Sequence, residues 1–137
     1  MHVERINPPT LLPPEGHTHI VRVTGGTTLY VSGQGAYGPD RHLVGPGDYY
    51  AQTKQAFTNV LTALSAVGAS YHDVVKATYY VARVTPDALG DFARAMNEVL
   101  GSESEPPAAT FVGVQSLAYD EMLVEIDVIA VVDSNDP

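Results

Sequence analysis

The stretch MLVEIDVIAVV, residues 122–132, decides the fold because its side chains would alternate between two very different faces of a strand. The even positions give an unbroken apolar face that is expected to carry the helices of the domain; it consists of Met122, Val124, Ile126, Val128, Ala130 and Val132. The odd positions set Glu125 and Asp127 among three aliphatic residues, Leu123, Ile129 and Val131.

The mixed character of the odd face predicts that this face is covered as well. Leaving three large aliphatic side chains in water would lose about 1.5–3 kcal/mol of burial each. The sequence offers no third helix as a cover, so another subunit is the expected one. Glu125 and Asp127 would then lie near a subunit interface, where carboxylates pair with a partner or bind a ligand.

Two helices are predicted upstream. Asp48 is a good N-cap for the first, and Gly68 suits the left-handed position past its end. Its buried stripe repeats with the helical period at Phe57, Val60, Leu61 and Leu64.

The second helix is predicted within TPDALGDFARAMNEVLG, residues 85–101. Thr85 is its expected N-cap, Pro86 takes the first helical position, and Gly101 follows the end. The expected buried stripe is Leu89, Phe92, Met96 and Val99.

Strands are predicted where β-branched and aromatic residues gather, at 18–23, 27–33, 73–84, 108–117 and 121–132. The first two are separated by TGG and are typical of a hairpin. This order favours an α+β fold in which both helices lie on one face of one mixed sheet, with residues 1–137 forming a single domain.

Composition excludes several functions. The chain of 137 residues has a net charge of −9 and no Lys or Arg after Arg94, which disfavours nucleic-acid and membrane partners. It has no cysteine, so disulfides, thiolate nucleophiles and cysteine-based zinc sites are excluded. The N-terminus lacks an apolar signal region, and a cytoplasmic protein without a cofactor is expected.

Several ordered motifs resemble the RidA/YjgF family: LYVSGQ (29–34), AQTKQAFTNVLTALSAVGAS (51–70), DVVKATYYV (73–81), PPAATFVGVQSL (106–117) and LVEIDVIAV (123–131). The resemblance implies a chorismate-mutase-like fold and a homotrimer whose sheets form a central barrel with the helices outside. Small carboxylates would bind in three clefts between adjacent subunits. The family activity that the resemblance implies is hydrolysis of enamines and imines, such as 2-aminoacrylate, to 2-oxo acids and ammonia.

The resemblance also assigns candidate site residues. The family's water-positioning glutamate corresponds to Glu125, and a tyrosine of the second strand corresponds to His19; these two are the candidate catalytic residues. The substrate-binding arginine of the family's P-A-R-S/T motif falls on Ala109, so the usual anion clamp would be absent and the substrate preference altered. The other candidate substrate-binding residues are Ser32, Gly33, Thr110, Phe111 and Asn97.

Alternatives remain open for each of these residues. Glu125 could pair with Lys76, Arg83 or a partner's hydroxyl for assembly alone, and His19 could be a surface histidine. His17 and His19 form an H-x-H pair, but no third ligand is evident, so no metal site is expected. Without the arginine, a non-catalytic, metabolite-binding trimer is the main alternative to an enzyme acting on a small molecule, and RNA cleavage is a third hypothesis.

Overall fold

The computed structural model describes residues 1–101 and 105–134. Four strands form a mixed sheet in the order β3-β6-β4-β5. Neighbouring strands are antiparallel except β4 and β5, which are parallel and are joined through a helix, as a parallel pair requires. The strands are β3 (Thr27–Gln34), β4 (Val74–Ala82), β5 (Ala108–Val114) and β6 (Val124–Val132).

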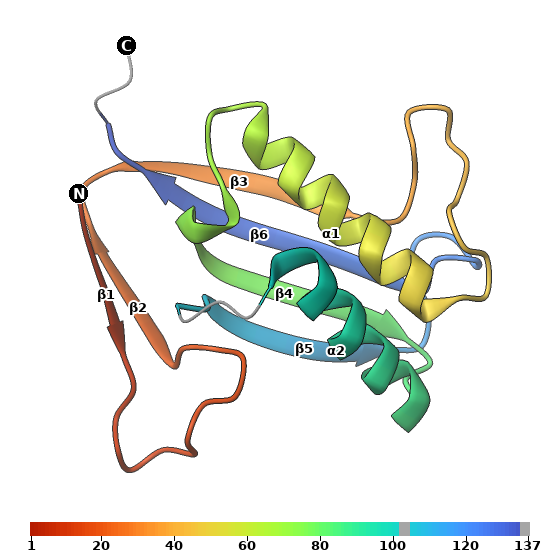
Figure 1. The fold of residues 1–137 in the computed structure, drawn as a ribbon, viewed down its shortest axis with the longest axis horizontal. Helices are drawn as coiled ribbons and strands as arrows, with labels where there is room; N and C mark the ends of the chain where they lie inside the picture. Colours follow the sequence, from red (N-terminus) through yellow and green to blue (C-terminus); the bar gives the residue numbers. More distant parts are fainter. Residues whose placement is uncertain (102–104, 135–137) are drawn as a thin grey trace.

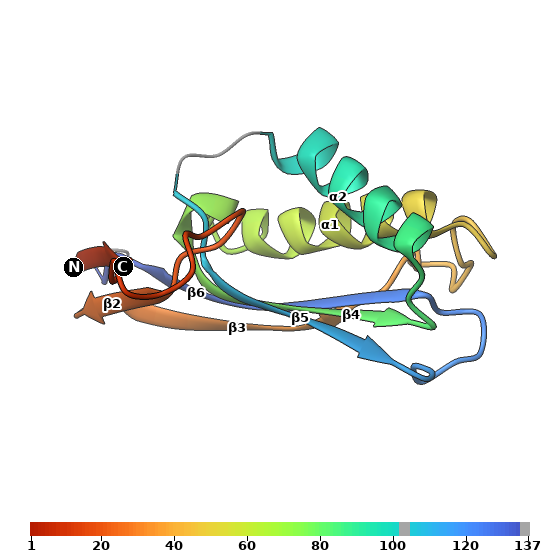
Figure 2. The ribbon, with the colours of Figure 1, turned by 90° about the horizontal axis from the view of Figure 1, so that it is seen from below.

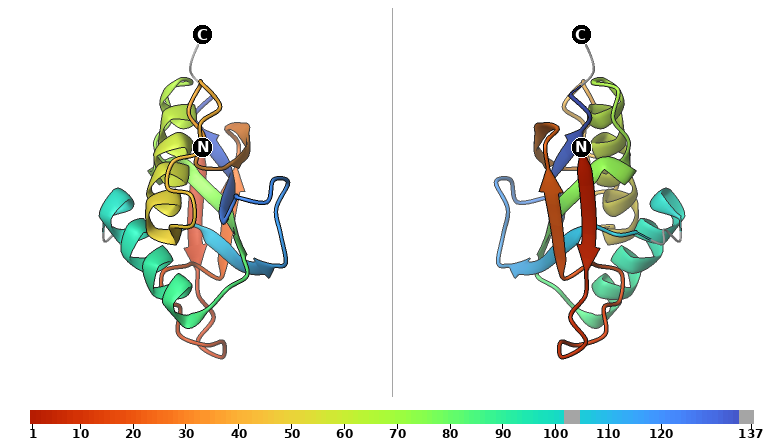
Figure 3. Two further views of the ribbon diagram at one scale, coloured as in Figure 1. Left: turned by 90° about the vertical axis from the view of Figure 1, so that its right-hand side faces the viewer. Right: turned by 90° about the vertical axis from the view of Figure 1, so that its left-hand side faces the viewer.

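Both helices lie on the same face of this sheet. Helix α1 (Tyr49–Ser65) runs over β3 and β6, and α2 (Pro86–Leu100) runs beside it over β4 and β5 (Figure 1). The side view in Figure 2 and the two end views in Figure 3 show a helical layer on one side and none on the other. A short 3-10 helix, η1 (Tyr71–Asp73), leads into β4.

The helix boundaries follow the predicted capping residues. Asp48 accepts a hydrogen bond from the backbone N–H of Ala51 at 3.0 Å, and Thr85 caps α2 in the same way. Gly68 and Gly101 have φ angles of 74° and 76°, the left-handed conformation expected just past each helix.

The buried stripe of α2 differs from the prediction at its first turn. Phe92 is buried, with Met96 and Val99 partly buried beside it, but Leu89 is 46% exposed. Ala88 and Ala95 are buried instead. The small side chains allow this helix to approach α1 closely. At the N-terminal end of α2 the buried stripe is therefore shifted by one residue, from Leu89 to Ala88.

The even-numbered face of β6 forms the floor of the core, as predicted. Its even-numbered residues from 124 to 130 are at most 1% exposed, Met122 just before the strand is 5% exposed, and Val132 is partly buried against the core. Above them Phe57 of α1 is fully buried, and its ring centroid lies 5.8 Å from those of Tyr79 and Phe92. Aromatic rings from α1, α2 and β4 therefore join the two layers.

The prediction for the odd-numbered face is wrong for two residues. Leu123 is 5% exposed because it precedes the strand and packs into the core. Val131 is 6% exposed and lies against Gly26, with Met1 nearby. Of the three aliphatic residues only the half-buried Ile129 lies on the open face, beside its cross-strand neighbour Tyr30, which is 81% exposed.

The predicted hairpin is also wrong, although both of its strands exist. Strand β2 (Ile20–Thr24) pairs with β1 (His2–Ile6), which the sequence analysis did not predict, in a separate two-stranded antiparallel sheet. Gly25 and Gly26 have φ angles of 77° and 86°, and the chain there passes from this sheet into the four-stranded one. Hence the strands do not all belong to one sheet.

Within the described residues, neither helix is long and apolar enough to span a bilayer.

Candidate functional site

Glu125 stands in β6 on the face of the sheet that has no helices. Its cross-strand partner is Tyr80 of β4, and its side chain is half-buried. The two basic residues that were alternative partners for it bind elsewhere: Lys76 donates to Thr110 at 2.9 Å and Arg83 to the carbonyl of Gln115 at 3.3 Å. Over the described residues Glu125 makes no ion pair.

A β-bulge in β3 brings the backbone of Gly33 against this carboxylate. The register between β3 and β6 shifts by one residue between Val31 and Gln34, and Ser32 and Gly33 lie within the shift. A Cβ atom built on Gly33 would overlap Oε1 of Glu125 and lie 2.9 Å from its Cδ. A bulge redirects the chain locally, and here only a glycine leaves room for the glutamate.

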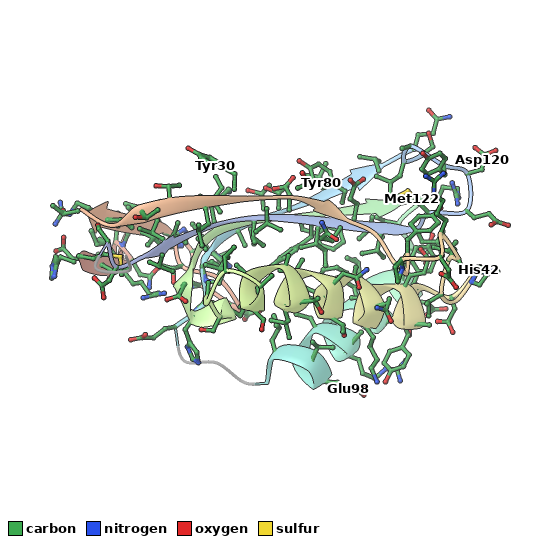
Figure 4. All side chains as sticks on the ribbon, turned by 90° about the horizontal axis from the view of Figure 1, so that it is seen from above. Tyr30, His42, Tyr80, Glu98, Asp120 and Met122 are labelled. Atoms are coloured by element: carbon green, nitrogen blue, oxygen red, sulfur yellow. The ribbon has the colours of Figure 1, made fainter. Side chains whose placement is uncertain are left out.

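Tyr80 is a further member of this group that the sequence analysis missed. Figure 4 shows Tyr80 and Tyr30 projecting from the same face of the sheet, away from the helices. The negative charge of Asp127 raises the pKa of the Tyr80 hydroxyl, with smaller contributions from desolvation, a hydrogen bond to Asp127 and the charge of Glu125. Tyr80 therefore keeps its proton at neutral pH and can donate it in a hydrogen bond. The alternation of Lys76, Thr78 and Tyr80 in β4 was the available signal.

Two polar side chains of α1 form hydrogen bonds with the backbone segments on either side of this group. Gln52 is fully buried; its amide donates to the carbonyls of Gly45 and Glu121, and its oxygen accepts from the N–H of Leu123 at 2.8 Å. Asn59 donates to the carbonyl of Gly35 at 2.8 Å, just after the bulge. These bonds fix the loop after β3 and the entry to β6, and thereby the two strands that carry Gly33 and Glu125.

The candidate residues of β5 are divided between the two faces of the sheet. Ala109 pairs with the buried Ala77 and packs against the core on the helix side. Thr110 lies on the open face with Lys76, and Phe111 returns to the helix side, where its ring meets that of Phe92 at 5.2 Å. Ala109 therefore lies on the opposite face from Glu125.

Asn97 lines a cavity of about 250 Å³ on the helix side, between α2, η1 and the segment that enters β5. The hydroxyls of Tyr71 and Tyr79 lie 3.4 Å apart at this cavity. Burial raises the pKa of both phenols, and most strongly that of Tyr71. Apolar and polar side chains share the lining: Leu61, Tyr71, Tyr79, Met96, Asn97 and Leu100.

His19 lies just before β2, close to the entry of β5. Its backbone N–H donates to Asn7 at 2.9 Å, and its Nε2 lies 2.7 Å from the carbonyl oxygen of Leu12. The preceding Thr18 binds the carbonyls of Pro106 and Pro107 through its hydroxyl and its N–H. His19 is thus near the segment that leads to Ala109, and not in the group around Glu125.

The candidate residues therefore form two groups within one chain. Glu125, Gly33 and Ser32 gather on the open face of the sheet with Tyr80. Asn97 and Ala109 lie on the helix side, with His19 near the entry to β5. No group of three His, Cys, Asp or Glu side chains that could hold a metal ion occurs in the described part of the chain. The first group offers a carboxylate for proton transfer, and the second offers a small cavity.

The fold and the order of these residues define a known class of protein. The family model described as endoribonuclease L-PSP matches residues 13–132, and the chain belongs to this family, whose members are also called RidA, YjgF or RutC proteins.

Relatives and solved structures agree with this assignment. A RutC family protein of Pyrococcus abyssi is 38% identical over 108 residues, which cover 77% of this chain and 79% of that one. A protein of Capra hircus named 2-iminobutanoate/2-iminopropanoate deaminase is 36% identical over 106 residues, covering 76% and 72% of the two chains. The crystal structure of a Rid family protein of unknown function from Yersinia pestis is 37% identical, covers 96% of this chain and 100% of that one, and superposes with a TM-score of 0.86.

Proposed function

We propose that this protein hydrolyses small 2-imino carboxylates to 2-oxo acids and ammonia, with Glu125 as the acid–base group. The observation that carries the proposal is the Glu125 carboxylate, which has no ionic partner among the described residues and lies against the backbone of Gly33. Relatives that are 33–36% identical are named 2-iminobutanoate/2-iminopropanoate deaminase, which supports the substrate class.

The chemistry needs one group that can accept and then donate a proton. Glu125 takes a proton from a water molecule as the water oxygen attacks the carbon of the C=N bond, and it passes that proton to the nitrogen, which gives a carbinolamine. Glu125 then takes the hydroxyl proton of the carbinolamine and passes it to the amino nitrogen as the C–N bond breaks, so that ammonia leaves and the carbonyl of the 2-oxo acid forms. An enamine would first need a proton on carbon to become the imine. Tyr80 is protonated at neutral pH and could orient the water or the substrate.

The direct test is an assay on an imine made in place. An amino-acid oxidase generates 2-iminobutanoate from 2-aminobutanoate, and semicarbazide traps the imine in competition with the protein. Active protein lowers the rate of semicarbazone formation and raises the rate of 2-oxobutanoate release. An unchanged trapping rate at a protein concentration above that of the oxidase would contradict the proposed function.

The active site is proposed to lie between copies of the chain. In one chain Glu125 and Ala109 are on opposite faces of the sheet, so a second copy must bring the two groups together. Tyr30, 81% exposed, stands beside Ile129 on the face that lacks a helical cover. This face and the resemblance to homotrimeric relatives support a trimer.

The expected mass in solution is three times the 14.6 kDa of one chain, measured by light scattering during gel filtration. Tyr30→Asp places a charge on the apolar part of the open face and is expected to shift the mass toward that of one chain. Tyr119→Asp is a matched control, because Tyr119 is also exposed, at 66%, but lies in the loop before β6. A single-chain mass for the unaltered protein would contradict the shared site.

A metabolite-binding protein without catalysis is the second candidate. The observation that favours it is Ala109, whose methyl group packs against the core and cannot bind an anion. Such a protein would bind 2-oxo acids saturably but leave the trapping rate unchanged. RNA cleavage, the activity in the family description, is disfavoured by the net charge of −9, because phosphate backbones are attracted to basic surfaces.

A further inference from the structure

The β1–β2 sheet has two faces with different chemistry. On one face Arg22 donates two hydrogen bonds of 2.6 and 2.9 Å to the carboxylate of Glu4, and Arg22 is 62% exposed. Arg5 is opposite Val21 in this pairing and points to the other face, which holds the partly buried valines Val3, Val21 and Val23. Arg5 is only 19% exposed, and its guanidinium group lies on the apolar face of this two-stranded sheet, the β1–β2 ribbon.

Arg5 is poorly satisfied in this position. Its Nε is buried and has no hydrogen-bond partner among the described residues. Its ion pair among the described residues joins Nη1 to the carboxylate of Glu105 at 3.7 Å, longer than a hydrogen bond. A buried donor without an acceptor is unfavourable, most of all when the donor group is charged. A carboxylate that approached Nε and Nη together would remove this cost.

The other basic residues have partners of their own or, as for Arg41, lie in another loop. Lys54 and Arg94 pair with acidic residues around α1 and α2. Lys76 and Arg83 donate to Thr110 and to the Gln115 carbonyl, and Arg41 lies in the loop before α1. Arg5 is therefore the guanidinium best placed for an acid that binds near the entry of β5.

The ion pair with Glu105 brings Arg5 beside the cavity of the second group of candidate residues, although Arg5 is not itself one of the residues that line it. Glu105, its weak partner, lines the 250 Å³ cavity together with Asn97, Pro106 and Pro107. Thr18 ties the loop before β2 to the carbonyls of Pro106 and Pro107, so the ribbon that carries Arg5 is anchored at the cavity. Ala109 lies two residues after Pro107 in the chain.

We propose that Arg5 binds the carboxylate of a small 2-oxo or 2-imino acid at the mouth of this cavity, displacing Glu105. The inference rests on the proposed function for its substrate class, and it names the cation that such an anion requires. The apolar lining of the cavity accepts the short side chain of the acid. Glu105 holds the guanidinium when the acid is absent, and it competes with the acid for Arg5.

Binding of 2-oxobutanoate to the full chain tests the proposal without any turnover. Dissociation constants are measured by isothermal titration or by changes in the ¹H–¹⁵N spectrum. Arg5→Gln is expected to weaken binding at least tenfold, since a charge-assisted bidentate contact is lost. Arg22→Gln, on the other face of the same ribbon, is the matched control and leaves the constant unchanged. Glu105→Gln removes the competitor and tightens binding severalfold.

Further measurements separate this role from a structural one. The neutral 2-oxobutanamide binds Arg5→Gln and the unaltered protein equally, because it carries no charge for the guanidinium. If Arg5→Gln weakened the amide as much as the acid, or if Glu105→Gln did not tighten acid binding, the proposal would be overturned. The absence of 2-oxobutanoate binding to the unaltered protein would overturn it too.

The two proposals fail in different ways. Binding that depends on Arg5, together with an unchanged imine-trapping rate, contradicts the enzymatic function and supports the role of Arg5. Active hydrolysis whose KM is the same in Arg5→Gln supports the function and overturns the role of Arg5.

Discussion

Glu125→Gln is expected to lower kcat/KM for imine hydrolysis by about 10²–10⁴-fold, the usual contribution of a general acid–base group. Glutamine has the size of glutamate and can still accept a hydrogen bond, but it cannot take a proton from water. The loss is expected mainly in kcat, since the substrate carboxylate would be bound elsewhere. The measurement is the rate of 2-oxobutanoate release from imine generated in place.

Asp127→Asn is the matched control for this change. Asp127 is two residues along β6 on the same face, and it contacts the hydroxyl of Tyr80. Its substitution removes an equal charge and is expected to change kcat/KM by less than tenfold. It should also move the pKa of Tyr80 back toward the ordinary value for tyrosine, because Asp127 is the main cause of the upward shift. Equal losses in the two variants would indicate a general electrostatic effect and contradict the role of Glu125.

The Glu125→Gln variant also tests whether the site is shared. If Glu125 and Arg5 act in the same site from different copies, Glu125→Gln and Arg5→Gln each impair every site when tested alone, but assemblies mixed from the two variants contain some sites with both side chains intact. Dissociating and reassembling the two variants together should then recover part of the activity. A site built within one chain would give no recovery.

Much of the fold can be predicted from interactions between residues that are neighbours in the sequence. The caps at Asp48 and Thr85 and the glycines at 68 and 101 mark helix ends because they satisfy free backbone groups or adopt a left-handed conformation. The alternation of β6 is equally local, and its even face is the floor of the core. These features depend on neighbouring residues only, so the sequence reveals them.

The features that the sequence did not predict depend on distant segments. β1 exists because it pairs with β2, and HVERI carries little signal on its own. Leu89 is exposed because close packing of α2 favours the small Ala88. Val131 is buried at a point where the distant Gly26 lies against it, with Met1 nearby. The prediction of three exposed aliphatic residues on the open face of the sheet is therefore partly wrong. The main exposed apolar group of this face is Tyr30, which the sequence did not assign to either face.

The candidate site shows the same division. The motif resemblance assigned Glu125 and Gly33 to one site, and the structure places the carboxylate against that glycine. Their roles remain proposals. Tyr80 was missed although its alternation in β4 is visible, and Arg5 was missed because its proposed role arises from a buried nitrogen that has no hydrogen-bond partner among the described residues. No pattern in the sequence reports the absence of a hydrogen-bond partner.

Gly33→Ala is expected to reduce hydrolysis by roughly 10–100-fold while leaving the fold nearly unchanged. The added methyl group would overlap Oε1 of Glu125, 2.9 Å from Cδ and 3.0 Å from Cγ, and the contacts are with the end of a flexible side chain rather than with backbone. Glu125 would swing away at little cost in stability, since Gly33 has no positive φ angle that an alanine would strain. A misplacement of about 1 Å in a catalytic group can cost 10²-fold in rate.

The measurement pairs kcat/KM with the free energy of unfolding in urea for Gly33→Ala and for Gly90→Ala. Gly90 lies in α2, and a Cβ there would meet nothing within 4 Å, so its replacement tests the general effect of removing a glycine. Gly90→Ala should stabilise the helix by up to about 1 kcal/mol and leave hydrolysis unchanged.

If Gly33→Ala kept full activity, the position of the carboxylate against the bulge would not matter, and Glu125 would act from some other orientation. If it lost activity only in proportion to lost folded protein, the effect would belong to the bulge and not to the carboxylate. Only a loss of rate in a fully folded protein links the glycine to the chemistry through Glu125.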